Sequence, residues 1–190
     1  MNGGLNSQSA VYANASQPLY PRVPVQVKLL HMYRMADYTH ANLIVPRLWL
    51  GNRKAAADDE FLRANNVTTV FNCTKTLPFH SSVLRKYRLP VDDNLEAGEI
   101  KNMESWAPEA VYKVIAEYNR GETILIHCHA GMQRSAALMA MVLITMTQKP
   151  ADDVMRHIRA KRPVAFFPEA NFEEAIRGYD MTLRKELQKH

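Results

Sequence analysis

The chain has 190 residues, of which 47% are hydrophobic, which is enough for one α/β domain with a sizeable core. Two cysteines are too few for a disulfide framework, and the chain has neither a secretory signal nor an apolar run of about eighteen residues, so we expect a soluble intracellular protein, cytoplasmic or nuclear, outside any membrane. The net charge of +5 suits acidic partners. Because the basic residues are scattered along the chain, nucleic acid is disfavoured as a partner, although the charge does not exclude it.

Residues 1–40 are predicted to form an N-terminal extension. Met1–Pro24 is rich in Asn, Ser, Gln and Gly without a steady apolar period, which predicts a flexible arm. Residues 25–36 carry apolar side chains at helical spacing, which predicts a helix. This helix either packs against its own domain or forms the interface of a homodimer, and the sequence leaves both open.

Residues 41–190 show the alternation of strands and helices that an α/β domain requires. The first part of this region predicts two strands joined by a turn over Asn42–Leu50, a helix over Lys54–Ala64, a buried strand over Val67–Asn72, a short strand over Arg88–Val91 and a helix over Trp106–Tyr118. Ser105 is the expected N-cap of this last helix, and Pro108 is expected in its first turn. We therefore expect an α/β fold with a central, mostly parallel sheet of about five strands, flanked by helices on both faces.

The stretch Thr123–Ser135 combines a strand, a loop and the start of a helix. Thr123–Ile126 is a β-branched apolar run, typical of a buried parallel strand, and the Ala- and Met-rich run Ala136–Met146 is predicted to be helical. The glycine-containing loop between them lies at the carboxyl end of a strand and at a helix N-terminus. Backbone amides and the helix dipole converge there, which predicts an anion site.

Cys128 and Arg134 give this anion site chemical reactivity. The helix dipole and unpaired amides lower the pKa of a thiol in such a loop, so Cys128 is predicted to be a thiolate that can attack phosphorus. The planar guanidinium of Arg134 matches two phosphate oxygens. Ser135 follows directly, and its hydroxyl is placed to donate to the sulfur when the thiolate leaves.

The run H-C-H-A-G-M-Q-R-S over residues 127–135 resembles the signature loop of the cysteine-dependent phosphatases, specifically the dual-specificity protein tyrosine phosphatases. Further matches extend the resemblance over about Asn42–Tyr179. It implies a protein tyrosine phosphatase-like fold and hydrolysis of phosphotyrosine and phosphoserine or phosphothreonine in phosphorylated proteins through a cysteinyl phosphate. It also implies that no cofactor or metal is needed. Gln133 departs from the Ser, Lys or Gly of many relatives, which bears on substrate preference.

The resemblance also implies roles for the loop residues. His127 is expected to hold the loop and to help keep the pKa of the thiolate low. The residues expected to bind the substrate phosphate are His129, Ala130, Gly131, Met132, Gln133 and Arg134. The side chain of His129 itself is predicted to be exposed, and neither histidine has partners at the spacing of a zinc site.

A proton donor for the leaving group is expected on a separate loop. Leu89–Asn94 is the place where carboxylates follow a predicted strand before the cysteine loop, and it resembles the family segment in which the acid stands three residues after a proline. That count favours Asp93 as the general acid, with Asp92 as the alternative.

Cys73 ends the strand expected to lie beside the one that leads to Cys128. It is either a small buried apolar residue or a redox partner, because some phosphatases of this class protect the nucleophile as a reversible disulfide with a cysteine on a neighbouring strand.

Two helices are predicted to close the domain. Ala151–Lys161 predicts a basic helix, and a final helix begins near Pro168 and ends near Lys185. The R-P…P-x-x-N-F arrangement resembles the closing segment of the family, but Asn171 is displaced by two residues from the commonest pattern, so no role is assigned to it. The four basic residues Arg156, Arg159, Lys161 and Arg162 are expected to form a solvated helix face.

Two other functions remain open. An RNA 5′-triphosphatase of the same superfamily would use the same loop, whereas a phosphoinositide enzyme is disfavoured because the loop lacks lysines. A non-catalytic phosphoprotein-binding module is also disfavoured, since such modules usually lose the cysteine, the arginine or the acid.

Overall fold

The computed structural model describes residues 39–189. The predicted arm, the predicted helix at residues 25–36 and a homodimer formed through it therefore lie outside the described residues. The described elements are β1 (Ala41–Val45), β2 (Leu48–Gly51), α2 (Arg53–Ala57), α3 (Asp59–Ala64), β3 (Thr69–Asn72), β4 (Arg85–Arg88), α4 (Ala97–Asn119), β5 (Ile124–His127), α5 (Arg134–Thr147), α6 (Ala151–Lys161) and α7 (Glu173–Leu187). Within them no helix is long and apolar enough to cross a membrane.

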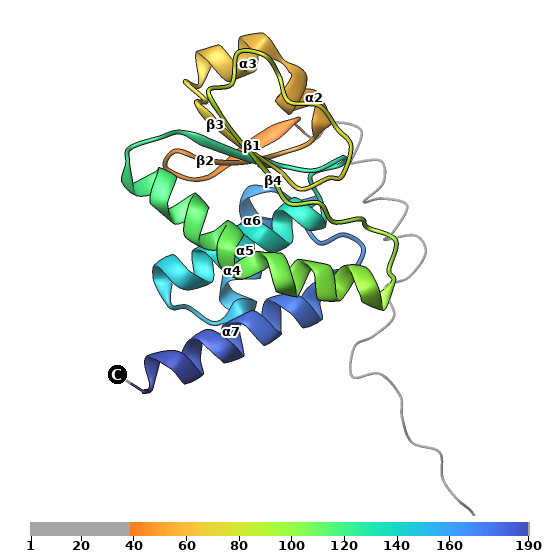
Figure 1. Ribbon diagram of the computed structural model, residues 1–190, viewed down its shortest axis with the longest axis vertical. Helices are drawn as coiled ribbons and strands as arrows, with labels where there is room; N and C mark the ends of the chain where they lie inside the picture. The colour runs from red at the N-terminus through yellow and green to blue at the C-terminus, as the bar shows by residue number, and fades with distance from the viewer. Residues whose placement is uncertain (1–38, 190) are drawn as a thin grey trace, which may run out of the picture.

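The five strands form one sheet in the order β1-β2-β5-β3-β4, in which only β1 runs antiparallel to its neighbour. Helices α2 and α3 lie on one face, and α4 to α7 lie on the other (Figure 1). The predicted fold class is confirmed. Gly51, His127 and Asn72 are register partners at the carboxyl ends of the three central strands, so the residues that follow them meet at one edge of the sheet.

The core explains why the first three residues of β5 are apolar. Ile124 and Ile126 pack into the large cluster that the sheet shares with α4 to α7, whereas Leu125 packs into the smaller cluster under α2 and α3. A strand that is covered on both faces has no solvated side. Helix α5 is buried from Ser135 to Ile144, so it is the central helix of its layer and holds the preceding loop firmly.

Two element boundaries differ from prediction in the first half of the chain. The single helix predicted over Lys54–Ala64 is two short helices, because the side chain of Asp58 accepts from the amide of Phe61 at 3.1 Å and starts α3 anew. The strand predicted over Arg88–Val91 is instead β4 at Arg85–Arg88, and beyond it the Leu89 amide still donates to the Asn72 carbonyl at the end of β3, at 2.9 Å.

Helix α4 begins nine residues earlier than predicted. Ser105 is therefore not its N-cap but an interior residue whose hydroxyl donates to the carbonyl of Lys101 at 2.8 Å. Pro108 lies inside the helix rather than in its first turn, and Trp106 is 40% exposed. The additional turns form because Met103 packs fully into the core, which outweighs the local preference of proline for a first turn.

The last two helices match their predictions more closely. Helix α6 has the predicted bounds, and its inner face buries Val154, Met155 and Ile158. Helix α7 starts at Glu173, five residues after Pro168, because the segment before it turns back toward the cysteine loop and hydrogen-bonds there.

Candidate active site

Residues 128–134, which we call the phosphate loop, join β5 to α5. Cys128 is only 1% exposed, and its Sγ accepts from the Gly131 amide and from the Ser135 hydroxyl, each at 3.2 Å. Burial acts to raise the pKa of the thiol, but the charge of Arg134, the Ser135 hydroxyl and loop amides outweigh burial, so the pKa lies below its ordinary value. The site therefore favours a thiolate.

Gly131 is required by the path of the loop. Its φ is +69°, in the left-handed region, and a Cβ built there would lie 2.4 Å from the carbonyl oxygen of Gly51. The loop can therefore approach the end of β2 only with glycine at this position, and the approach brings Arg53 within reach, so that its amide donates to the His129 carbonyl at 3.2 Å.

Arg162 supports the phosphate loop from the side opposite the site. Its guanidinium donates to the carbonyls of Gly131 at 2.7 Å and Ala130 at 3.4 Å, and also to the Asn42 side chain at 2.6 Å. The prediction that Arg162 belongs to a solvated helix face is wrong, because it is 0% exposed and lies just beyond α6. By holding loop carbonyls on the outside, it leaves the amides to face the site.

Arg134 joins the phosphate loop to the segment that carries the aspartates. Its Nη1 donates to the Val91 carbonyl at 3.2 Å, and its buried Nε has no hydrogen-bond partner among residues 39–189. A guanidinium with a free N–H beside a thiolate is suited to bind an oxyanion. Arg134 can therefore hold phosphate oxygens and keep the neighbouring segment close at the same time.

The structure distinguishes the two aspartates. Asp92 forms an ion pair with Lys75 at 2.8 Å, and its amide donates to Glu99 at 2.8 Å. Lys75 also pairs with Glu99 at 2.6 Å, and the pKa of Glu99 is lowered to about 2, first by the bond from Lys75 and then by the Asp92 amide. Asp93 is exposed and accepts from the Asn171 amide group at 2.7 Å. Asp92 is therefore engaged with a cation, whereas the Asp93 carboxylate accepts from a neutral amide.

Sequence reasoning did not predict the contacts that two residues make at this site, although it named Gln133 among the residues expected to bind phosphate. Gln133 is buried and hydrogen-bonds the segment before α7, and Asn171 in that segment reaches Asp93. The sequence signals were the unusual Gln133 in the phosphate loop and the displacement of Asn171 from the commonest family pattern.

His127 is buried under the phosphate loop, and its Nδ1 lies 3.4 Å from the Cys128 carbonyl. Burial, opposed by this backbone contact, lowers the pKa of His127 to about 4 from an ordinary 6.5. The ring is therefore neutral near pH 7 and lies buried beneath the loop. His129, in contrast, is exposed as predicted.

The lowered pKa of His127 predicts how the free energy of unfolding depends on pH. The unfolded chain binds a proton at this residue as the pH falls below about 6.5, whereas the folded state does so only near pH 4, so stability is lost between these values. We expect urea unfolding to show a loss of about 2 kcal/mol from this residue between pH 7 and pH 4.5. His127→Gln should be less sensitive to acid over that range, and an equal loss in both proteins would contradict the assignment.

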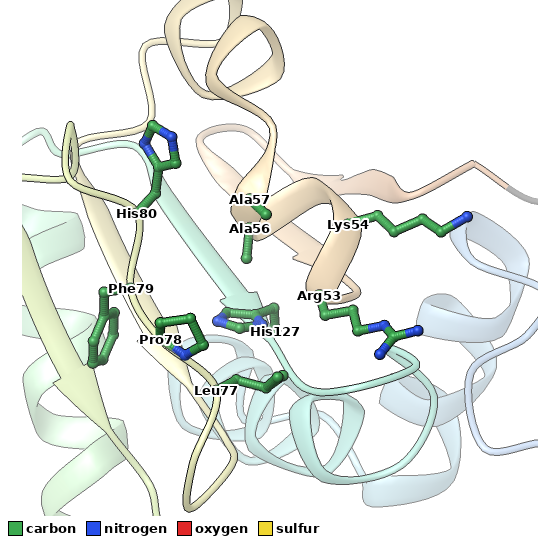
Figure 2. Close-up of a pocket in the computed structure, with 9 residues that line it drawn as sticks. All are labelled: Arg53, Lys54, Ala56, Ala57, Leu77, Pro78, Phe79, His80 and His127. Carbon is green, nitrogen blue, oxygen red and sulfur yellow. The ribbon is translucent and has the colours of Figure 1, made fainter.

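A pocket of about 480 Å³ opens beside the phosphate loop (Figure 2). Arg53 and Lys54 of α2 extend on one side, the turn with Pro78 and His80 lies on the other, and His127 lies between them. The lining also includes Ala56, Ala57, Leu77 and Phe79. The lining is mostly apolar, and the charged ends of Arg53 and Lys54 point away from the interior of the pocket (Figure 2).

Cys73 lies beside the nucleophile. Its amide donates to the His127 carbonyl at 2.8 Å, and both cysteines are free thiols in the same core cluster. Burial and then the negative charge of Cys128 raise the pKa of Cys73 well above its ordinary value, although Arg134 opposes this. Cys73 is therefore a neutral neighbour of a thiolate.

Comparison with known proteins agrees with this geometry. Residues 48–181 match the family model of the dual specificity phosphatase catalytic domain. The chain belongs to the dual-specificity phosphatase family. Mouse dual specificity protein phosphatase 2 is 30% identical over 122 residues, which cover 64% of this chain and 37% of that protein. Arabidopsis thaliana dual specificity protein phosphatase 1 is 26% identical, with 83% of this chain and 77% of that protein covered.

Solved structures of the dual-specificity phosphatase family share the fold. A mouse putative dual specificity phosphatase complexed with zinc tungstate is 25% identical, with a TM-score of 0.66, and covers 78% of this chain and 91% of its own. Human DUSP28 superposes with a TM-score of 0.66 at 24% identity, with 77% of this chain and 96% of its own covered, which is a likeness of fold. The present chain spans less than two fifths of the length of the mouse relative above, so what it shares with that relative is the catalytic domain.

Proposed function

We propose that this protein is a phosphatase that hydrolyses phosphotyrosine and phosphoserine or phosphothreonine in proteins. The observation that carries the proposal is the environment of Cys128, whose Sγ lies 3.2 Å from both the Gly131 amide and the Ser135 hydroxyl and whose pKa is lowered by Arg134 against the effect of burial. Family membership supports the same chemistry.

The reaction takes place in two steps. The Cys128 thiolate attacks phosphorus, the bond to the ester oxygen breaks, and Asp93 gives its proton to that oxygen, while Arg134 and the amides of residues 129–134 bind the phosphoryl oxygens. Asp93, now a carboxylate, takes a proton from water, which attacks phosphorus and breaks the S–P bond. Ser135 donates to the departing thiolate, so the enzyme returns to its starting state with inorganic phosphate as product.

Phosphorylated proteins are the proposed substrates, and the cytoplasm or nucleus is the proposed location. The charged ends of Arg53 and Lys54, which point away from the pocket interior, favour acidic sequence around the phosphorylated residue. A reducing compartment keeps a reactive thiolate such as that of Cys128 free, and both cysteines are free here.

The experiment that tests this function compares substrate classes at equal concentration. Full-length protein should release phosphate from phosphotyrosine and phosphothreonine peptides faster than from RNA that carries a 5′-triphosphate. Faster release from the RNA would assign the triphosphatase function instead. Tight binding of the peptides without any release would show a binding module.

Cys73 is proposed as a redox partner of the nucleophile. Peroxide would transfer one oxygen atom to the Cys128 thiolate, giving sulfenic acid and hydroxide. Attack by the Cys73 sulfur would then form the disulfide and break the S–O bond, and the sulfenic oxygen would leave as water with the Cys73 proton. We expect mild peroxide to give a Cys73–Cys128 disulfide, seen by mass spectrometry, and dithiothreitol to restore activity. Sulfinic acid at Cys128 with Cys73 still free would contradict this proposal.

A further inference from the structure

The segment 166–172, between α6 and α7, is fixed against the phosphate loop. Its two ends are buried through Phe166 and Phe172, and the Phe166 amide donates to the Met132 carbonyl at 2.8 Å. Between these ends, the side chain of Gln133 in the phosphate loop hydrogen-bonds the backbone of the segment. The segment therefore has a defined position relative to the loop.

Gln133 uses both ends of its carboxamide for this purpose. Its Nε2 donates to the carbonyls of Phe167 at 2.9 Å and Glu169 at 2.7 Å, and its Oε1 accepts from the Asn171 amide at 3.0 Å. The side chain is 5% exposed, so these bonds form away from water, where a lost partner is costly. Only a side chain with both a donor and an acceptor can satisfy all these groups.

Asn171 extends this arrangement to the general acid. Its backbone is fixed by Gln133, and its Nδ2 donates to Oδ1 of Asp93 at 2.7 Å. The neighbouring Asp92 is held separately by Lys75. Asp93 lies on an exposed loop, and the hydrogen bond from Asn171 joins it to a rigid part of the domain.

We propose that Asn171 is a positioning residue for Asp93, and that Gln133 sets its place relative to the bound phosphate. The inference deepens the proposed function and depends on it. Because the amide occupies Oδ1, the proton that Asp93 transfers is carried on Oδ2, so the hydrogen bond selects which oxygen faces the leaving group. The amide neither gives nor takes a proton, and it acts only through the orientation of the carboxyl group.

Dependence on the leaving group tests this role. Asn171→Ala should lower kcat for a phosphoserine peptide, whose alkoxide needs a proton, by about 10-fold, within the range of a general acid's contribution. It should lower kcat for p-nitrophenyl phosphate, whose leaving group needs little protonation, by less than about 3-fold. Gln133→Met, which keeps length but removes the amide, should show the same selective loss. Glu169→Ala changes an exposed side chain of the same segment, and the ratio of the two rates should stay at its wild-type value.

A double-mutant cycle excludes a merely structural effect. In the Asp93→Asn background, Asn171→Ala should cause no further loss with the phosphoserine peptide, because the group that it orients is gone. Equal losses with both substrates, or additive losses in the cycle, would overturn the inference while the proposed function stands. Wild-type protein that turns over neither substrate would overturn the proposed function, and the inference with it.

Discussion

Cys128→Ser should reduce hydrolysis of every phosphate ester to the uncatalysed background, a loss of at least about 10⁴-fold in kcat. The phosphate loop lowers the pKa of a thiol, but a serine hydroxyl starts from a far higher value and stays protonated, so the nucleophile is lost. Because serine is close to cysteine in size and the site already supplies hydrogen bonds, the fold and phosphate binding should persist. Phosphate release by the purified variant measures the effect.

The matched control is the second buried cysteine. Cys73→Ala removes the neighbouring thiol without touching the nucleophile, and kcat should stay within about 3-fold of wild type under reducing conditions, a change of less than about 1 kcal/mol in the barrier. Substantial turnover by Cys128→Ser would assign the chemistry to another residue and contradict the cysteinyl-phosphate mechanism. A covalent phosphate on Cys128, trapped by rapid acid quench of the wild type, would support it independently.

Asp93→Asn should lower kcat for phosphoserine and phosphothreonine peptides by about 10²-fold or more, as expected for the loss of a general acid. The amide keeps the shape of the side chain and can still bond Asn171, but it has no proton to give to an alkoxide. Turnover of p-nitrophenyl phosphate should fall by less than about 5-fold. The ratio of the two rates is the measurement.

Asp92→Asn is the companion variant. Asp92 pairs with Lys75, so its loss should weaken the local ion-pair network with Glu99 and lower both rates to a similar, small extent. If Asp92→Asn alone shows the leaving-group effect, then Asp92 is the acid and the assignment from geometry is wrong.

The sequence predicted the sheet and the cysteine loop well because their signals are local. The apolar run before Cys128 and the helix after it required no distant partner to be recognised, and the register of β3 and β5 then placed Cys73 beside the loop as expected. The start of α4 was missed because Met103, far from the predicted N-cap, anchors the extra turns through tertiary packing.

The supporting groups of the site could not be predicted in the same way. Arg162, Gln133 and Asn171 act through residues 31 to 123 positions away in the chain, and a polar residue that satisfies distant backbone groups leaves no periodic pattern. A basic residue after a basic helix is usually solvated, so burial of Arg162 contradicts the average behaviour of its type. Such residues become visible only when the chain segments that they join are placed side by side.

The bonds of Arg162 have a consequence for where the catalytic unit can be cut. Its guanidinium also donates to the Thr39 carbonyl at 3.1 Å, and the Asn52 amide donates to the His40 carbonyl at 2.9 Å, so the two residues before β1 supply backbone acceptors to the buried Arg162 and to Asn52. A fragment that starts at residue 41 would leave part of a buried charge without its acceptor, which is costly. A fragment prepared to contain this domain should therefore include Thr39, because its carbonyl accepts a hydrogen bond from an arginine more than 120 residues further along the chain.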